Sequence, residues 1–511
     1  MAFDPATLPD ACDIAVVGSG SGGAAVTRRL VEAGWEVTLI EAGGDGRPAE
    51  VVADPTQWIR IAGTEWDWGH AYAPRPQVDD RAIPIPRGRI LGGSGQINAM
   101  MWYRGHPADY DAWAEMGCDG WRFEDCLPAF RRCEDWPAGG ALRGQGGPLR
   151  VAPPADPHPL ALALVEAAWQ AGMPVLDDPN GPSNEGAALA NLNIRAGRRF
   201  GPAEGYLAPV LEAPNLTVAL ATRALAILWR GDRAAGLRLA RRGGTVELTA
   251  RRGVVLAAGA FETPRLLMLS GAGPEAALSR LGLPARLALP ELGENLADHP
   301  LVRGCVFRAR RTMPPPRDNG GGAILNWRSD PALPRPDLHA FAVPGRSATA
   351  EVTADHALPD AGVFSIVPGL MGSRSTGRMA LTSADPAAPL HLDPGFLTDP
   401  ADRTALLAGI EQALDLAARP ALAAWTDGAL APGPDRERFL RCACSTFYHP
   451  CGTARMGRDP GAVTTPRLRV AGAEALWIAD ASVIPRIPSC NTHAPVTMIG
   501  ERAAEFILED A

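Results

Sequence analysis

Three glycines near the start of the chain have the spacing that binds the phosphates of a dinucleotide. Gly18, Gly20 and Gly23 read Gly-x-Gly-x-x-Gly directly after the apolar run 14–17. In such a motif the first glycine permits a tight turn, the second lets the backbone approach a pyrophosphate, and the third lets the following helix pack closely on the strand. The amides and the positive dipole end of that helix then face the phosphates. The motif therefore predicts a bound dinucleotide.

A carboxylate roughly twenty residues after the glycines narrows the choice of dinucleotide. The predicted helix ends at Gly34, and a second apolar run, 37–40, is followed directly by Glu41. A carboxylate at this place accepts both hydroxyls of an adenosine ribose and repels a 2′-phosphate, so Glu41 favours FAD or NAD over NADP. The strand, helix and second strand together predict a βαβ unit, which flavin and nicotinamide proteins share.

The composition is that of an ordinary globular protein. A length of 511 residues exceeds what one hydrophobic core usually organises, so we expect two domains. The net charge of −8 gives no electrostatic reason to expect nucleic acid or an anionic membrane as a partner. All 49 basic residues are arginine, which excludes a Schiff-base lysine and a P-loop lysine.

The sequence gives no sign of export, of a membrane span or of a structural metal. The first strand begins by Asp13, which leaves no room for a signal peptide, and no apolar run approaches the length of a membrane span. The nine cysteines are scattered, and Cys442 and Cys444 have no second pair or histidine cluster that could complete a zinc site. We therefore expect a cytoplasmic protein with reduced cysteines and no metal. Its oligomeric state is not indicated.

Dinucleotide-type segments recur in three separated parts of the chain. After the opening unit, strand-like runs at 216–220 and 224–229 precede a strand at 254–258, which leads through Gly259 into a helix. The last part, 476–511, combines a buried strand with an amphipathic closing helix. This recurrence predicts one nucleotide-binding domain assembled from discontinuous pieces.

The predicted fold class is α/β, with a Rossmann-like cofactor domain and a second, α+β domain over it. Residues between the dinucleotide-type segments are rich in proline and contain strand-like runs such as 337–343 and 364–370, which we expect to form an antiparallel sheet. The cofactor domain is predicted at 10–148, 202–300 and 445–511, and the substrate domain at 149–201 and 301–444.

Five further segments, in the correct order, make the chain resemble the glucose-methanol-choline (GMC) oxidoreductase family. The resemblance extends from about Asp13 to Ala504 and is weakest between 301 and 441, where that family builds its variable substrate domain. The segments are PRGRILGGSGQINAMMWYRGHPADYDAW from Pro86, GAFETPRLLMLSGAG from Gly259, LGENLADH from Leu292, FYHPCGTARMG from Phe447 and WIADASVIPRIPSCNTHAPVTMIGERAA from Trp477.

The resemblance implies bound FAD and the oxidation of an alcohol by hydride transfer to flavin N5. An alcohol becomes a good hydride donor only as its O–H proton is removed, and neutral imidazole is a suitable base. By the family match, His449 is the primary base, and His493 is the partner that fixes the hydroxyl or alkoxide. His299, which also belongs to a family motif, is expected to have a structural role near the cofactor.

The resemblance also implies the FAD contacts, position by position. Gly18, Gly20, Gly23 and Glu41 match the residues that hold the phosphates and ribose. Further contacts are Gly93, Ser94, Asn98 and Met101 on the pyrophosphate and isoalloxazine side, Ala224 at the adenine through its backbone, Tyr448, and Asp480 with Ala481 at the ribityl chain. No metal ligand is implied.

One departure from some family members concerns how the cofactor is attached. Those members bind FAD covalently through a histidine directly before the asparagine that matches Asn98, and Ile97 stands there in this chain. We therefore predict noncovalent FAD.

Three functions are compatible with these motifs. The first is an FAD-dependent alcohol oxidase or dehydrogenase, with O2 or a diffusible electron acceptor as second substrate; oxidase is favoured, since no export or membrane segment suggests delivery to a respiratory chain. The second is a lyase of the hydroxynitrile lyase type, which shares the scaffold and uses the flavin without redox turnover. The third, a nicotinamide-dependent dehydrogenase, is supported by the opening motif alone.

The sequence leaves the alcohol open among aryl or furanic alcohols, choline-like alcohols, amino sugars and sugars. Trp327, Phe341 and Phe364 are candidates to line an aromatic site, although ordinary core positions are the favoured interpretation of all three.

Overall fold

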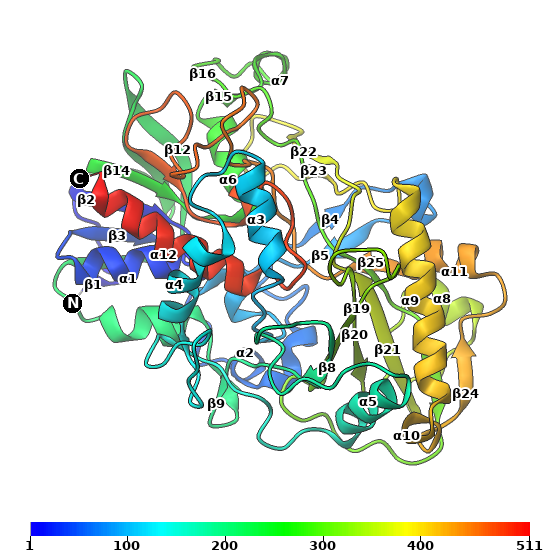
Figure 1. The fold of residues 1–511 in the computed structure, drawn as a ribbon. Helices are drawn as coiled ribbons and strands as arrows, with labels where there is room; N and C mark the ends of the chain where they lie inside the picture. Colours follow the sequence, from blue (N-terminus) through cyan, green and yellow to red (C-terminus); the bar gives the residue numbers. More distant parts are fainter. Residues whose placement is uncertain (1, 511) are drawn as a thin grey trace.

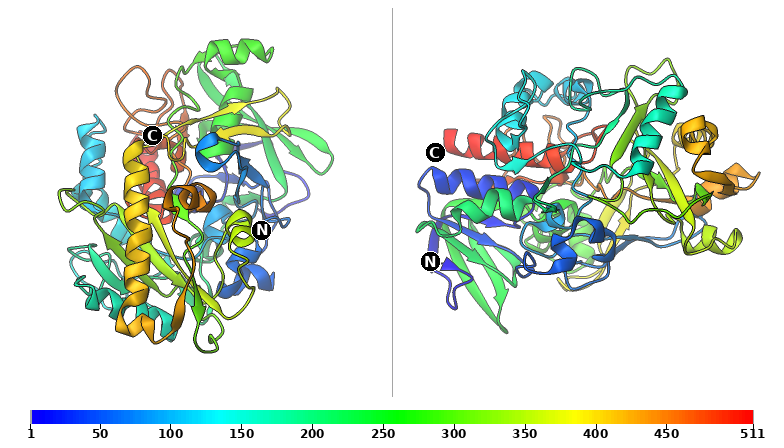
Figure 2. Two further views of the ribbon diagram at one scale, coloured as in Figure 1. Left: turned by 90° about the vertical axis from the view of Figure 1, so that its right-hand side faces the viewer. Right: turned by 90° about the horizontal axis from the view of Figure 1, so that it is seen from below.

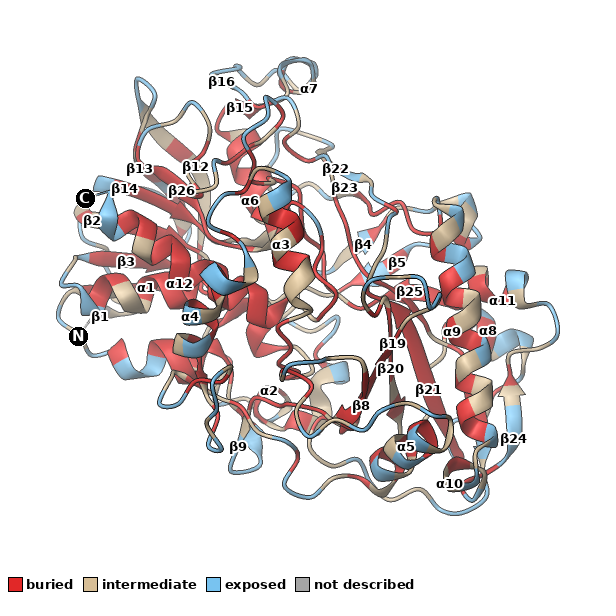
Figure 3. Ribbon diagram, in the orientation of Figure 1, coloured by how far each residue is buried: buried red, intermediate tan, exposed pale blue. Residues whose placement is uncertain are grey.

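Two large β-sheets dominate the protein, one toward each end of the molecule (Figure 1). The structure is a computed structural model that describes residues 2–510. Helices and loops cover the outer faces of both sheets, so the strands are largely buried, as the red colouring of Figure 3 shows. The two sheets correspond to the two predicted parts of the fold.

The first sheet has eight strands and confirms the Rossmann-like domain built from discontinuous segments. Its order is β1-β11-β3-β2-β14-β13-β12, and β26 pairs with the far half of β14. The strands β1, β11, β3, β2 and β26 run parallel with the end of β14. Their bounds are β1 Ala2–Phe3, β2 Ala11–Val17, β3 Val37–Ile40, β11 Leu216–Ala219, β12 Thr222–Arg230, β13 Arg233–Arg241, β14 Gly244–Leu256 and β26 Leu476–Ile478.

β14 is longer than the sequence predicts. The sequence predicts a strand only for its apolar end. Residues 244–249 include polar and largely exposed side chains, and they pair antiparallel with β13. The same strand then continues parallel to β2 through residues 249–256. A hairpin strand that is exposed in its first half carries too weak an apolar signal to be recognised alone.

Two helices from opposite ends of the chain, α1 (Ser21–Glu32) and α12 (His493–Glu509), pack side by side (Figures 1 and 2). Glycine allows this close approach, because a Cβ atom on Gly500 would lie 2.4 Å from the carbonyl oxygen of Gly22. A Cβ atom on Gly22 would lie 3.3 Å from the carbonyl oxygen of Val496 in α12 and 2.0 Å from that of Ala479, which follows β26. A salt bridge at 2.8 Å between Arg29 and Glu501 also joins the two helices. The start of α12 is thereby held beside the glycine motif.

The second sheet is antiparallel throughout, as predicted for the substrate domain. Its order is β24-β18-β21-β20-β19-β8. In addition, β17 pairs with β21, and β25 pairs with β17. The bounds are β8 Gly186–Leu189, β17 Pro300–Val302, β18 Val306–Ala309, β19 Ala323–Trp327, β20 Leu338–Val343, β21 Val363–Leu370, β24 Thr426–Ala431 and β25 Cys444–Thr446.

Helices that the sequence did not predict cover one side of this sheet. α9 (Pro400–Ala418) packs on β21, and α5 (Pro159–Gln170) packs on β8, β19 and β20 (Figure 2). α9 begins with two clear start signals, an Asp399 side chain that accepts from the amide of Ala401 and a proline at the first helical position. Because this region is rich in proline, the sequence did not predict α9, although Pro400 is its first residue.

The remaining elements connect the two sheets or cap their ends. The larger ones are α3 Pro107–Glu115, α4 Phe123–Cys133, α6 Gly259–Leu269, α7 Glu275–Arg280, α8 Ala350–Asp355 and α11 Arg436–Ala443. α6 is the helix predicted after Gly259. Two-stranded ribbons include β4 (His70–Tyr72) with β5 (Ile83–Ile85) and β22 (Arg378–Leu381) with β23 (Leu390–Asp393).

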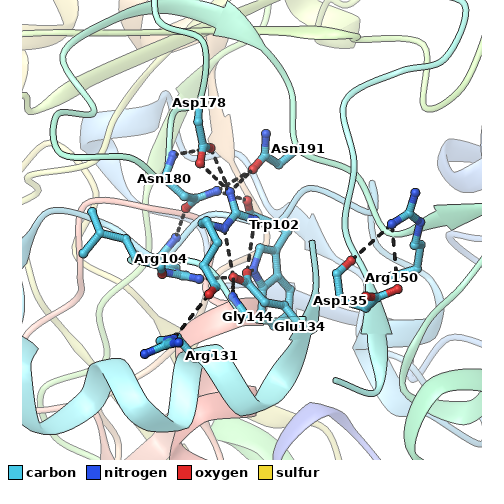
Figure 4. Close-up of polar contacts among 12 residues, drawn as sticks. Trp102, Arg104, Arg131, Glu134, Asp135, Gly144, Arg150, Asp178, Asn180 and Asn191 are labelled. Carbon is cyan, nitrogen blue, oxygen red and sulfur yellow. Dashed lines mark hydrogen bonds and ion pairs between the residues drawn. The ribbon is translucent and has the colours of Figure 1, made fainter. Parts of the chain in front are cut away.

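Figure 4 shows a cluster of buried charged and polar side chains around Glu134. Glu134 is fully buried and pairs with Arg104 and, at 2.9 Å, with Arg143. Arg143 also pairs with Asp178 at 2.7 Å, so two cations face two carboxylates. The indole N–H of Trp102 donates to Glu134 at 3.0 Å. The cluster thus holds residues 102–104, which directly follow the glycine-rich segment.

Two findings limit other kinds of site within residues 2–510. No helix of this range combines the length and the apolar character needed to cross a membrane. The same residues contain no group of three or more histidine, cysteine or acidic side chains arranged to hold a metal ion.

Candidate active site

A cavity of about 430 Å³ lies between the two sheets and is lined by residues of both. It is bordered by all but one of the predicted site residues. The exception is Gly23, where a Cβ atom would lie 2.0 Å from the carbonyl oxygen of Gly18, so this glycine serves the packing of α1 on β2. Those bordering the cavity are Gly18, Gly20, Glu41, Gly93, Ser94, Asn98, Met101, Ala224, Tyr448, His449, Asp480, Ala481 and His493.

The start of α1 presents free backbone amides to this cavity. Its N-cap residue, Gly20, provides no side-chain cap, and Ser21 and Gly22 line the cavity directly after it. Gly18 turns the chain with a φ of +95°. Uncapped amides at the positive end of a helix dipole fit a pyrophosphate group. This end of the cavity therefore fits the phosphates of a dinucleotide.

Glu41 lies at the end of β3, where its carboxylate borders the cavity. Its Oε2 atom accepts from the hydroxyl and amide of Ser19, at 2.5 and 3.1 Å, and Oε1 accepts from the amide of Gly43 at 2.8 Å. Burial raises the pKa of the Glu41 carboxyl, which these hydrogen bonds oppose. The side chain is thus held in one orientation at the place where a ribose is expected.

The other predicted cofactor residues are held mainly by contacts within the protein. The Oδ2 atom of Asp480 accepts from the amide of Gly259 at 2.9 Å and from the hydroxyl of Thr263 at 2.6 Å, which ties the end of β26 to the start of α6. The side chain of Asn98 accepts from the amide of Met100 at 2.8 Å. Both residues border the cavity, and their side-chain oxygens already accept hydrogen bonds within the protein.

His449 is aimed by the unusual backbone of the residue before it. Tyr448 has a φ of +68°, a left-handed conformation that is uncommon for a bulky side chain. The guanidinium of Arg87 donates to the carbonyl of Tyr448 at 2.7 Å, and the amide of His449 donates to the carboxylate of Asp298 at 2.9 Å. Strain of this kind persists only where surrounding contacts enforce it, and it concentrates at functional sites.

Both ring nitrogens of His449 have partners, and these define its tautomer. The amide nitrogen of Asn491 lies 3.2 Å from Nε2 and can only donate, so Nε2 accepts. The Nδ1 atom then carries the proton and donates to Nδ1 of His299 at 3.0 Å. Burial, followed by the charges of His299 and Arg87, holds the pKa of His449 well below its usual value. The ring is therefore neutral, with a lone pair on Nε2.

His493, the predicted partner of His449, lies elsewhere in the cavity. It is the first residue of α12, and its Nδ1 atom is 2.7 Å from the hydroxyl oxygen of Ser21 at the start of α1. Burial, followed by the charge of Arg199, lowers its pKa to about 4. Asn491 is the side chain that contacts His449 directly, while His493 lines the same cavity.

The contact between Asn491 and His449 was not predicted from the sequence. Asn491 stands two positions before His493 in the same motif, and an amide gives no acid–base signal in a sequence. His299, for which a structural role is predicted, is fully buried and in direct contact with the ring of His449, which is compatible with that role. The recurrence of both in family motifs was the available signal.

Aromatic side chains form one wall of the cavity beside His449. The ring of Phe447 stacks on that of His449, with 5.6 Å between centroids and 4° between planes. Phe341, from β20, lies 6.0 Å from Phe447 and also lines the cavity. Of the three aromatic candidates in the sequence, only Phe341 borders the cavity; Trp327 and Phe364 are buried in the core.

Family models agree with this geometry. Two models described as GMC oxidoreductase match residues 13–301 and 373–500. The oxygen-dependent choline dehydrogenase of Rhizobium etli is 33% identical over 533 residues, covering 97% of this chain and 95% of the relative.

Solved structures have the same fold over the whole chain. The crystal structure of pyridoxine 4-oxidase from Mesorbium loti has a TM-score of 0.92 and 33% identity, covering 97% of this chain and 98% of the other. Formate oxidase from Aspergillus oryzae, studied for its FAD modification, has a TM-score of 0.89 and 25% identity, covering 99% of both chains. These findings agree with the flavin reading and not with the nicotinamide alternative. The chain belongs to the GMC oxidoreductase family and is an FAD-dependent oxidoreductase.

Proposed function

We propose that this protein oxidises a neutral aromatic primary alcohol to the aldehyde, with O2 as the electron acceptor. The observation that supports the proposal is the contact between His449 and Asn491 inside a cavity that also holds the uncapped start of α1. Residues 10–148, 202–300 and 445–511 would bind the cofactor, and 149–201 with 301–444 would bind the substrate.

The chemistry divides between the cofactor and two side chains. Bound FAD would supply the hydride acceptor, held by the glycine motif, Glu41 and the segment at Gly93 and Ser94. The Nε2 lone pair of His449 takes the hydroxyl proton of the alcohol. The amide of Asn491 donates a hydrogen bond to the same oxygen as negative charge develops on it. Both groups approach one substrate atom from the protein side of the cavity.

This arrangement moves one predicted role from His493 to Asn491. An oxygen that loses its proton to His449 must lie near the Nε2 atom, where Asn491 already lies at 3.2 Å. His493 contacts Ser21 at the phosphate end of α1, and we assign it to holding the cofactor. A neutral imidazole suits this place because it can donate a hydrogen bond without adding a buried charge.

The walls of the cavity support a neutral aromatic substrate over a cationic one. Phe447 and Phe341 offer ring faces and edges beside the proposed base. Aromatic faces can attract a choline-like cation as well, but a free carboxylate would favour such a cation much more strongly than a neutral alcohol. The three carboxylates on the cavity are already engaged, Glu41 by Ser19 and Gly43, Asp480 by Thr263 and Ser482, and Glu262 by Arg265 and Arg223.

A panel of four substrate classes checks this proposal. The purified holoenzyme is given aromatic primary alcohols, choline, an amino sugar and a sugar in air, and hydrogen peroxide and aldehyde are measured. We expect an aromatic alcohol to give both products with the highest kcat/KM. Faster turnover of choline would contradict the substrate class, and turnover only with an artificial acceptor would contradict the oxidase assignment.

We further predict that the FAD is bound noncovalently. Ile97 occupies the position from which some family members attach the flavin by a histidine, and isoleucine offers no nucleophile. Acid or heat denaturation is therefore expected to release all of the yellow chromophore into the supernatant. Colour that stays with the precipitated protein would show a covalent bond through another residue.

A further inference from the structure

A second, much smaller cavity lies behind Asn491. Its volume is about 10 Å³, close to the roughly 10 to 15 Å³ that one water molecule needs. Asn491 borders both this cavity and the large one, so the two are separated by the amide that contacts His449. The other residues around it are Tyr103, Gly105, Pro179, Asn184, Ile324, Asn326, His339, Ser489 and Cys490.

Three polar atoms at the small cavity have hydrogen-bonding capacity that no other described group satisfies. Tyr103 is 4% exposed and His339 is 2% exposed. Within residues 2–510, the Tyr103 hydroxyl, the Nε2 atom of His339 and the Oδ1 atom of Asn491 are buried without a partner. Buried polar atoms in native proteins nearly always have one, and ordered water is the usual partner where protein is absent.

The donors and acceptors among these atoms complement a single water molecule. Nδ1 of His339 lies 3.0 Å from Oδ1 of Asn326, whose Nδ2 donates elsewhere, so Nδ1 carries the proton and Nε2 accepts. Burial lowers the pKa of His339 to about 3, which keeps the ring neutral. Burial also raises the pKa of Tyr103, so its hydroxyl keeps a proton to donate. One donor and two acceptors therefore belong to side chains that border the same small cavity.

We propose that this small cavity binds one ordered water, which accepts from the Tyr103 hydroxyl, donates to His339 Nε2 and Asn491 Oδ1, and so fixes the amide of Asn491. Asn184 contributes a further unpaired Oδ1 atom. Turned by 180°, the amide of Asn184 would present its Nδ2 to the remaining lone pair of the water. Tyr103 and His339 are then positioning residues, acting on the reaction through Asn491.

The orientation of this amide has a chemical consequence, which rests on the proposed function of His449 as base. With Oδ1 held by the water, Asn491 turns Nδ2 to His449, whose Nε2 must then be unprotonated. The substrate hydroxyl can take the place of this amide contact and pass its proton to the Nε2 lone pair. With the amide reversed, Oδ1 faces Nε2 and favours a proton there, which stabilises the form that cannot act as a base. The water thereby selects the base-competent tautomer of His449.

The test compares Tyr103→Phe with Tyr110→Phe, a fully buried tyrosine whose hydroxyl donates to the carbonyl of Arg104. Flavin reduction by the best alcohol is followed anaerobically by stopped flow across a range of pH. We expect Tyr103→Phe to reduce flavin about tenfold more slowly near neutral pH, as for the loss of one hydrogen bond. Because the two neutral tautomers of His449 carry the same number of protons, the deficit should be the same at every pH where this ring is neutral, with KM and FAD content unchanged. Tyr110→Phe should keep the wild-type rates.

A rate deficit with unchanged KM, FAD content and pH profile separates positioning from a general structural effect. The titratable and charged groups around His449 are His299, His339, Arg87 and Asp298, and Tyr103→Phe alters none of them. A raised KM, a shifted pH profile or a loss of FAD would indicate only a packing role for Tyr103 and would overturn the proposal. Wild-type rates in Tyr103→Phe would overturn it as well.

A high-resolution crystal structure of the holoenzyme gives a readout that does not depend on activity. We expect one water within hydrogen-bonding distance of Tyr103, His339 and Asn491, and its loss or weakening in Tyr103→Phe. Side chains that close the cavity without water would overturn the proposal. If no alcohol reduces the flavin, the proposed function fails, while the presence of the water is still decided by this structure.

Discussion

Replacing His449 with glutamine is expected to slow flavin reduction by the alcohol about 10²- to 10⁴-fold, the range for loss of a general base. The Nε2 atom of His449 carries the lone pair that is proposed to take the proton, and it lies 3.2 Å from the amide nitrogen of Asn491. Glutamine keeps a polar side chain of similar length but cannot take the proton. Anaerobic stopped-flow absorbance of the flavin measures the effect directly, with the FAD content of each preparation determined first.

The matched control for this change is His391→Gln. His391 lies on β23, does not border the cavity and has no assigned role, so we expect the wild-type rate. A drop of less than about tenfold in His449→Gln with full FAD content would show that another group removes the proton.

The low pKa of His449 gives this prediction a pH signature. Burial lowers the pKa below its ordinary value of 6.5, so the neutral, active form persists as the pH falls through that value. Wild-type flavin reduction should therefore stay constant through 6.5 and decline only under more acidic conditions. An acid limb at or above 6.5 would contradict the geometry described for the ring.

Replacing Glu134 with glutamine is expected to destabilise the folded protein by about 3–5 kcal/mol, the cost of breaking a buried ion pair from one side. Arg104 and Arg143 are almost fully buried, and of the two only Arg143 would keep an ion pair, with Asp178. The change also removes the acceptor of Trp102, whose ring contacts His493 at 5.4 Å between centroids. Thermal unfolding at fixed FAD concentration measures the loss, and weaker FAD retention should accompany it.

Glu247→Gln is the control for this experiment. Glu247 pairs with Arg238 at 3.0 Å on the exposed part of β14, where both side chains are about half exposed. Exposed pairs contribute little, so we expect a change within about 0.5 kcal/mol. Equal destabilisation by the two changes would contradict the role given to burial at Glu134.

The fold could be predicted wherever the chain repeats a short apolar strand followed by glycine and a helix. The runs at 14–17, 37–40 and 254–258 are strand and turn signals that need no tertiary information, and β2, β3 and the end of β14 occupy them. α5 and α9 were not predicted because proline usually interrupts helices, and their region of the chain is rich in it. Pro159 and Pro400 nevertheless each begin a helix, at the one helical position that suits proline.

The site could be predicted as a set of segments but not as pairwise contacts. The motifs correctly brought the phosphate end and the histidine segment to one cavity. Which side chain faces His449 depends on the turn that precedes α12 and on the position of α12 beside α1. The residue types alone predict neither the conformation of this turn nor this packing. Asn491 and His493 are two residues apart, and only the coordinates show that the first contacts His449 while the second contacts Ser21.

The most direct test of the central claim is an anaerobic absorbance spectrum of the purified holoprotein during titration with aromatic primary alcohols. We expect one of these alcohols to bleach the flavin of the wild-type protein, and to bleach that of His449→Gln far more slowly. Air should then restore the oxidised spectrum with release of hydrogen peroxide. A yellow protein that no alcohol bleaches, but that cleaves a hydroxynitrile, would contradict the claim and identify a flavin that does not turn over.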